Sequence, residues 1–338
     1  MRSLAELEER LSRPRDVLVD DLRTLDGDIL ILGAGGKLGP SLVRLALRGV
    51  AAAGTGARVV AVSRFSEAGL ADALRAEGAV VVEADVTDDA ALAALPDAPN
   101  VVFLVGAKFG TSGREHATWA TNTYLPGRVA NRFAGSRIVA LSTGNVYPLV
   151  PVTAGGCVEQ TPLQPVGEYA MSCLGRERIL THFALKHDTP LALIRLNYAV
   201  EMRYGVLVDI ATAVQAGRPV DLTMGHANVV WQGYANEVTL RALRHTATPP
   251  FVLNLTGPET ISVRQVATAL AARLGREPVL TGTEAPTALL SNAQLCHRLF
   301  GYPDVPVAEL IEWTAHWVAE DNPLLGKPTG FQRRDGNF

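Results

Sequence analysis

A short apolar run that ends in a glycine-rich turn and continues into a helical pattern constrains this fold most strongly. Residues 28–32 (DILIL) favour a buried strand, and from Pro40 to about Val50 leucines recur at helical spacing. The turn between them consists of Gly33, Ala34, Gly35, Gly36, Lys37, Leu38 and Gly39. Glycines here let the backbone approach a pyrophosphate at the N-terminus of the helix, where unpaired N–H groups favour an anion. The alternative is that they only turn a strand into a helix, and the strands that follow argue against it.

Apolar strands and helices keep alternating as far as residue 200. We expect strands at residues 57–63, 79–83, 100–105, 136–142 and 191–197. We expect helices at about residues 68–77, 88–94 and 118–134, and another that opens near Tyr169. Strands that are apolar throughout and alternate with helices are typical of a parallel sheet covered on both faces. The sequence therefore predicts an α/β protein with a Rossmann-type, doubly wound parallel sheet.

Other segments are arranged around this sheet. Residues 1–27 predict a helical extension that begins with an amphipathic helix at 4–11, and residues 28–200 form the dinucleotide-binding domain. Residues 201–322 predict a smaller α/β substrate-binding lobe, interleaved with the first domain, and residues 323–338 an irregular tail. In the smaller lobe we expect a strand in VVWQG (229–233) and helices near residues 205–216, 233–246, 262–274 and 307–319.

Composition excludes several classes of partner. A formal net charge of −3 gives no electrostatic footprint for nucleic acid. No apolar stretch approaches the roughly 20 residues that span a bilayer, and the N-terminal residues lack a signal-peptide core. Cys157, Cys173 and Cys296 have unrelated spacings, which favour neither a disulfide framework nor a metal site. We expect a cytoplasmic protein that binds a small molecule.

Lysine is rare in this chain. Of its 31 basic residues only four are lysine, namely Lys37, Lys108, Lys186 and Lys327. A GC-rich genome that favours arginine would explain the bias. The position of each remaining lysine is nevertheless informative.

The end of the second expected strand indicates which dinucleotide binds. An acidic residue there would hold the adenosine ribose, but this chain has Ser63 and Arg64. A hydroxyl and a guanidinium suit a 2′-phosphate, so we expect NADP, with NAD as the alternative if Arg64 is an ordinary exposed arginine. Asp85 and Val86 follow the third strand, where Asp85 can contact the adenine.

Five ordered motifs resemble those of one enzyme family. They are Gly33-x-x-Gly36-x-x-Gly39, Asp85-Val86, LSTGNVYP, Tyr169 and RLNY. Over residues 28–320 the chain resembles the extended short-chain dehydrogenase/reductases, and more narrowly the NAD-dependent epimerase/dehydratase family. The resemblance implies that Tyr169 is the catalytic tyrosine and that Thr143 hydrogen-bonds the substrate oxygen. It also places Gly106 beside the cofactor, and Ser142, Asn145 and Asn197 beside the substrate.

The chain departs from this family where a lysine should follow the tyrosine by one helical turn. The family's lysine lowers the pKa of the phenol and binds the nicotinamide ribose, but this position holds Cys173. Lys108 in VGAKFG is the strongest substitute, since UDP-galactose 4-epimerases carry a comparable lysine there. Its alternative role is to bind a substrate or cofactor phosphate. Arg176 lies on the same helix face as Tyr169, about 10 Å further along the axis.

Two functions remain open on the sequence. The first is an NAD(P)-dependent oxidoreductase or epimerase that acts on a sugar, a sugar acid or a related polyhydroxylated molecule, with Tyr169 and Thr143 moving the proton. The second is a dinucleotide-binding sensor or scaffold that has lost catalysis, which Cys173 favours. The family's usual Tyr-Gly-Pro is missing after Asn197, which weakens an assignment to nucleotide sugars. Homodimerisation through a helix pair is usual in the family and is expected here. His116, Trp119 and His226 could border the pocket, but surface or core roles are expected for them.

Overall fold

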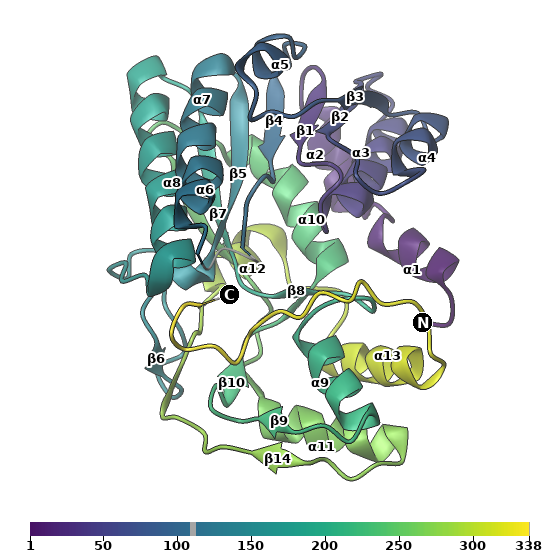
Figure 1. Ribbon diagram of the computed structural model, residues 1–338. Helices are drawn as coiled ribbons and strands as arrows, with labels where there is room; N and C mark the ends of the chain where they lie inside the picture. The colour runs from purple at the N-terminus through teal and green to yellow at the C-terminus, as the bar shows by residue number, and fades with distance from the viewer. Residues whose placement is uncertain (109–112, 338) are drawn as a thin grey trace.

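The computed structural model describes residues 1–108 and 113–337, and its centre is one parallel sheet (Figure 1). Its strand order is β12-β7-β5-β4-β1-β2-β3, and every neighbouring pair is parallel. The strands are β1 Ile29–Leu32, β2 Val59–Ser63, β3 Val80–Glu83, β4 Asn100–Phe103, β5 Arg137–Thr143, β7 Leu191–Leu196 and β12 Phe251–Leu255. The predicted α/β class is confirmed. The order reverses on the two sides of β1, and ligands of such sheets bind in the crevice beyond the strand ends at this switch point.

Helices cover both faces of the sheet because successive strand side chains point to opposite sides. Ile29 and Ile31 of β1 belong to one apolar cluster, and Leu30 and Leu32 belong to another. The first face is covered by α3 (Gly39–Ala53), α4 (Leu70–Ala76) and α10 (Gln232–Arg241). The second face is covered by α5 (Asp89–Ala93), α7 (Leu125–Arg132) and α8 (Gly167–His187).

The N-terminal residues form two helices, α1 (Leu4–Leu11) and α2 (Asp16–Arg23), which pack on the first face. A Cβ added at Gly49 of α3 would lie 2.6 Å from a methyl carbon of Leu22, so the glycine lets α2 approach closely. Arg15 binds Glu237 of α10 at 2.6 Å, which ties the same segment to the helices that cover the first face. These helices are therefore part of the main core.

The single helix expected at 118–134 is a run of three parts. Helix α6 (Glu115–Trp119) is followed by a π-helical turn, Ala120–Tyr124, and then by α7. Such a turn widens the helix and changes the direction of its side chains, a feature frequent at functional sites. Here it directs the buried Asn122 toward the loop after β4, where its amide binds both the N–H and the carbonyl of Ala107 at 2.8 Å. The loop that carries Gly106 and Lys108 is thereby fixed.

The smaller lobe is built on α9 (Val206–Gln215), α11 (Val263–Leu274) and α13 (Val307–Ala319). Short strand pairs accompany these helices: β9 (Val220–Asp221) with β14 (Leu280–Thr281), β10 (His226–Ala227) with β13 (Ile261–Ser262), β8 (Ala199–Val200) with β11 (Val230–Trp231), and β6 (Val150–Pro151) with β15 (Thr287–Ala288). The strand expected over VVWQG is only two residues long, because Gln232 already begins α10. Helix α12 (Gln294–Phe300) and the outermost sheet strand β12 were not expected.

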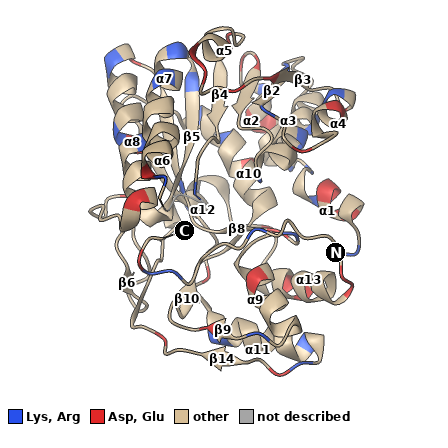
Figure 2. Ribbon diagram, in the orientation of Figure 1, with Lys and Arg blue, Asp and Glu red and all other residues tan. Residues whose placement is uncertain are grey.

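The C-terminal segment has no helix or strand within the described residues 323–337. It runs across the space between the sheet and the smaller lobe (Figure 1). Lys and Arg positions are scattered among Asp and Glu over both lobes (Figure 2). No helix in the described part of the chain has the length and apolarity needed to cross a bilayer.

Candidate active site

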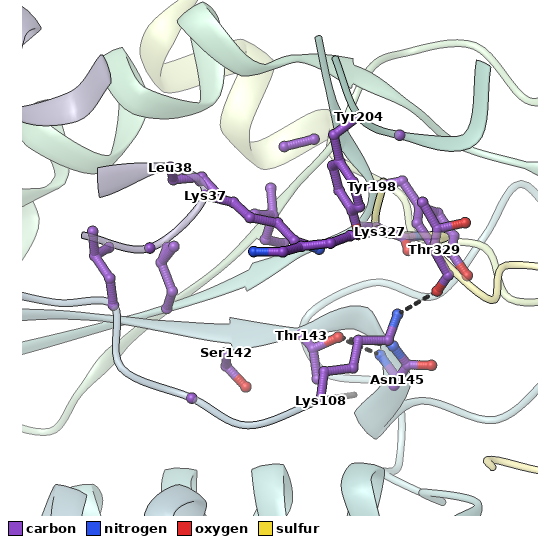
Figure 3. A pocket seen from close by; sticks show the side chains of 18 of the residues that line it. Lys37, Leu38, Lys108, Ser142, Thr143, Asn145, Tyr198, Tyr204, Lys327 and Thr329 are labelled. Atoms are coloured by element: carbon purple, nitrogen blue, oxygen red, sulfur yellow. Dashed lines mark hydrogen bonds between the residues drawn. The ribbon is translucent and has the colours of Figure 1, made fainter. Parts of the chain in front are cut away.

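A cavity of about 380 Å³ lies beyond the carboxyl ends of the central strands (Figure 3). The predicted site residues that line it are Gly33, Gly36, Lys37, Leu38, Gly39, Gly106, Lys108, Ser142, Thr143, Asn145, Tyr169 and Asn197. Residues far apart in the sequence therefore meet in one place. Further lining residues come from the smaller lobe and from the C-terminal segment, among them Tyr198, Tyr204, Lys327 and Thr329.

The glycine turn has the backbone geometry that binding of a dinucleotide phosphate requires. Gly33 has a φ of +91°, which side chains disfavour, and a Cβ there would lie 3.1 Å from the backbone nitrogen of Val105. A Cβ at Gly39 would collide with the backbone of Ala34, so glycine is needed where the helix meets the strand. The N-terminus of the 15-residue helix α3 begins at this turn. The chain thus fits a pyrophosphate with backbone N–H groups and a helix dipole.

The residues expected at the adenosine end lie together on the surface beyond this turn. Arg64 is 75% exposed, and its guanidinium lies 3.8 Å from the Asp85 carboxylate. Asp85 accepts hydrogen bonds from the Thr87 hydroxyl at 2.7 Å and the Thr87 N–H at 3.0 Å, which lower the pKa of Asp85. Ser63 stands against Gly35, since a Cβ there would lie 2.8 Å from the serine hydroxyl. Val86 is buried.

Tyr169 lies in the first turn of α8, and Thr143 and Cys173 are close enough to influence the pKa of its phenol. The Thr143 hydroxyl accepts from the Asn145 backbone N–H at 3.2 Å and from its side-chain amide at 3.0 Å. Thr143 in turn lowers the pKa of the phenol. Burial is the larger influence, and it raises the pKa of Tyr169 well above its ordinary value.

Cys173 occupies the position of the family lysine and is fully buried. Val146, Tyr147 and Cys157 form an apolar cluster with it. Burial raises the pKa of the Cys173 thiol, so the group facing the phenol is neutral. A neutral thiol gives the phenol none of the stabilisation that a lysine ammonium would supply.

Lys108 lies between two tyrosine rings at the edge of the cavity. Its Nζ is 5.8 Å from the ring centroid of Tyr169 and 5.8 Å from that of Tyr198, and it donates to the Thr329 carbonyl at 3.2 Å. Burial lowers the pKa of Lys108 to about 8, while Cys173 and Asp209 act in the opposite direction. The structure thus brings this lysine to the tyrosine and the cysteine.

Arg176 brings a second cation close to the phenol. Its guanidinium donates to the Leu141 carbonyl at 2.7 Å and to the Asn122 side chain at 2.8 Å. Its charge lowers the pKa of both Tyr169 and Cys173. The rise of the helix separates the backbones of Tyr169 and Arg176 by about 10 Å. The side chains come closer than this, because helix side chains lean back toward the N-terminus.

The Ser142 hydroxyl is part of a buried polar network. It donates to Glu177 at 2.6 Å, and Glu177 binds Arg195 at 2.7 Å with both side chains at most 6% exposed. Arg195 also donates to the Tyr147 hydroxyl at 2.8 Å. Ser142 therefore lines the cavity while its proton is directed away from it. Asn197 is likewise buried on the cavity wall.

Sequence reasoning missed four polar lining residues: Tyr198, Tyr204, Lys327 and Thr329. Tyr198 has a φ of 48°, a left-handed conformation that is uncommon for a bulky residue and typical of functional sites. Tyr204 stacks on Lys37, whose Nζ lies 3.5 Å from the ring centroid. Two features of the sequence could have indicated these residues. Tyr198 belongs to the RLNY motif, and Lys327 is one of only four lysines in the chain. Trp119 and His116 line a separate groove outside α6, and His226 lies in β10.

A parallel sheet with a glycine turn at its switch point and a tyrosine–threonine pair at the same edge defines a dinucleotide-binding protein of the short-chain dehydrogenase/reductase type. The sequence pattern of the NAD dependent epimerase/dehydratase family matches residues 29–200, and the chain belongs to that family. In the described residues no group of three or more His, Cys, Asp or Glu side chains could hold a metal ion.

Solved structures with low sequence identity share the fold. UDP-glucose 4-epimerase of Thermotoga maritima, with UDP-glucose, is 16% identical with a TM-score of 0.71, covering 87% of this chain and 99% of that one. WbmG of Bordetella bronchiseptica, with NAD, is 20% identical with a TM-score of 0.70, covering 88% and 96%. The dTDP-glucose 4,6-dehydratase DesIV of Streptomyces venezuelae, with NAD, is 18% identical with a TM-score of 0.73, covering 87% and 97%. No curated protein matches the chain significantly by sequence.

The buried Glu177–Arg195 pair behind the cavity should contribute to the stability of the fold. Glu177→Gln leaves the buried Arg195 guanidinium without its carboxylate, which we expect to lower the free energy of unfolding by about 3–5 kcal/mol. Urea unfolding measures the loss. Glu83→Gln, which breaks the exposed pair with Arg75 at 2.5 Å, is the control and should change little. Equal effects of the two substitutions would contradict a structural role for the Glu177–Arg195 pair.

Proposed function

We propose that this protein is an NAD(P)-dependent oxidoreductase or epimerase that acts on a sugar, a sugar acid or a related polyhydroxylated molecule. The observation that carries the proposal is that Tyr169 and Thr143 line the same cavity as the glycine turn. Family membership supports the cofactor class, and the sugar-nucleotide enzymes with the same fold support the substrate class. When bound, the nicotinamide would supply the hydride acceptor or donor.

The residues of the chain have separate tasks in this proposal. Asn145 holds the Thr143 hydroxyl, so Thr143 is oriented before substrate arrives and can hydrogen-bond the substrate oxygen. Tyr169 takes the proton from the substrate hydroxyl or returns it to a carbonyl oxygen. Lys108 and Arg176 supply positive charge that stabilises the phenolate, in place of the family lysine. Asn145 and Asn197 lie where they can contact the substrate hydroxyls.

A second function is favoured by one observation, the neutral Cys173 against the phenol. Without a positive charge that acts on Tyr169, the protein would bind a dinucleotide and perform no redox step, as a sensor or scaffold. The two functions differ in one measurement. The change in nicotinamide absorbance when candidate sugars are added occurs only in the enzyme.

Tyr169→Phe tests the proton relay. We expect turnover to fall by about 10²–10⁴-fold, the usual contribution of a placed acid or base, while dinucleotide affinity stays unchanged. Lys108→Met should raise the apparent pKa of the pH–rate profile, because the ammonium no longer stabilises the phenolate, so turnover at neutral pH falls. Steady-state rates as a function of pH measure both effects.

Cys173 supplies the matched controls for the relay. Cys173→Ser exchanges one small neutral group for another and should leave the profile in place. In a rewired site Cys173→Lys adds a second cation in a buried position, and activity should fall or stay flat. A tenfold rise with Cys173→Lys, together with an unchanged rate in Lys108→Met, would favour the lapsed sensor instead.

We propose NADP as the preferred dinucleotide, on the strength of Ser63 and Arg64. We expect Arg64→Ala to remove most of the preference for NADP(H) over NAD(H), since a charge-assisted hydrogen bond contributes about 1.5–3 kcal/mol, or roughly 10- to 150-fold. Calorimetric titration of both dinucleotides measures it. Arg273→Ala, at an exposed arginine of α11, should leave the ratio unchanged. Equal affinities of the unmutated protein for NADP and NAD would refute the preference.

We also propose a homodimer that forms through α6, α7 and α8. A groove lined by Trp119, Tyr124, Ile179 and Phe183 runs along these helices, and the Tyr124 side chain beside it is 66% exposed. Tyr124→Glu should convert the dimer to a monomer, because the charge would be buried in an apolar interface. Light scattering after size exclusion measures the mass. Tyr302→Glu is the matched control, because Tyr302 is also 66% exposed and lies outside the groove. A monomeric unmutated protein would exclude the proposal.

A further inference from the structure

The C-terminal segment is held on both lobes of the molecule. Leu325 donates its N–H to the Arg203 carbonyl at 3.0 Å, and Thr329 donates its N–H and hydroxyl to Asp209 of α9 at 2.8 and 2.6 Å. Further on, Gly336 packs against Gly167 at the start of α8, where an added Cβ would lie 2.6 Å from the Gly336 carbonyl oxygen. The segment between these contacts passes along the cavity and contributes Lys327 and Thr329 to its lining.

Three of the four lysines of the chain line this one cavity. Lys37 comes from the glycine turn, Lys108 from the loop after β4 and Lys327 from the C-terminal segment, and their side chains extend into the same space (Figure 3). Among the described lining residues these are the cations, and none is an arginine, aspartate or glutamate. In a chain where arginine far outnumbers lysine, this gathering is not explained by composition.

The charges of Lys108 and Lys327 both act on Lys37. Burial lowers the pKa of Lys37 to about 7, and the charges of Lys108 and Lys327 contribute to that shift. Asp209 is the acidic group that opposes it. The tyrosines that face Lys37 and Lys108, namely Tyr169, Tyr198 and Tyr204, have raised pKa values and are neutral, and so is the Cys173 thiol. With its lysines protonated, the cavity therefore carries an excess of positive charge.

We propose that Lys37, Lys108 and Lys327 form one binding site for a doubly charged, phosphate-class oxyanion, and that the C-terminal segment is part of this site. The inference rests on the proposed function only for the source of the anion. That source is either the pyrophosphate of the dinucleotide or a phosphate group of the substrate. Lysine ammonium groups bind phosphate as point charges, so the site recognises charge without requiring a bidentate geometry.

The site has a characteristic dependence on pH. Without an anion, Lys37 and Lys108 lose their protons as the pH rises through about 7 and about 8. A bound anion stabilises the protonated ammonium groups and raises both pKa values. Binding therefore takes up protons in this range, and the affinity falls as the pH rises from about 6.5 to about 9.

Calorimetric titration of the full chain with inorganic sulfate tests the site, because sulfate stays doubly charged over this pH range. We expect Lys327→Gln to weaken sulfate binding about 10- to 100-fold and Lys327→Arg to restore most of it. Titrations in buffers of different ionisation enthalpy should show proton uptake. Lys186→Gln is the matched control, because the fourth lysine lines the groove beside α8 instead of the cavity. Because Lys327 is exposed, neither substitution at this position should disturb folding.

A second titration, in the presence of saturating NADP, identifies the source of the anion. Competition with sulfate means that the lysines hold the dinucleotide phosphates, and simultaneous binding means that they hold a substrate phosphate; either result supports the site. Equal sulfate affinity in Lys327→Gln and the unmutated protein, or an equal loss in Lys186→Gln, would overturn it. Failure of the proposed enzyme would instead show as sulfate binding without any hydride transfer.

Discussion

The contacts of one buried guanidinium hold one edge of the cavity together. Arg176 of α8 binds the carbonyl of Leu141 in β5 and both the carbonyl and the side chain of Asn122 in the π-helical turn. A Cβ at Gly106 would lie 2.8 Å from the same guanidinium, so the loop after β4 packs directly on it. A strand, a helix, a widened turn and a loop therefore meet at Arg176. The positions of Tyr169, Thr143 and Lys108 all depend on these four elements.

Charge in the cavity is arranged differently from the family pattern. A single lysine one turn after the tyrosine normally serves both the phenol and the cofactor. Here the position is a neutral, buried cysteine, and cations line the cavity from the glycine turn, the loop after β4 and the C-terminal segment, while Arg176 in the interior of α8 acts on the phenol. Positive charge is thus present near the phenol as in the family. In the family it comes from one face of one helix, whereas here it comes from several separate segments.

Sequence reasoning reached the fold and half of the cavity. The glycine turn, the tyrosine–threonine pair and Lys108 were predicted because each lies directly after a strand or at a helix start, where parallel topology fixes the meeting point. Tyr204, Lys327 and Thr329 were not predicted, because they follow segments whose place depends on how the smaller lobe packs. The π-helical turn was also missed, since the apolar periodicity of residues 118–134 resembles that of an ordinary helix.

By itself the sequence determined the parallel sheet, its dinucleotide-binding turn and the identity of the residue that replaces the family lysine. These follow from local periodicity and from residue types at fixed spacing, which are properties of neighbouring positions. Only the tertiary structure decided which cations face Tyr169, and that three of the four lysines share one cavity. Contacts between residues as distant as Lys108 and Thr329 depend on the packing of whole elements, and no spacing in the sequence encodes them. The charge around the phenol is therefore a property of the folded chain.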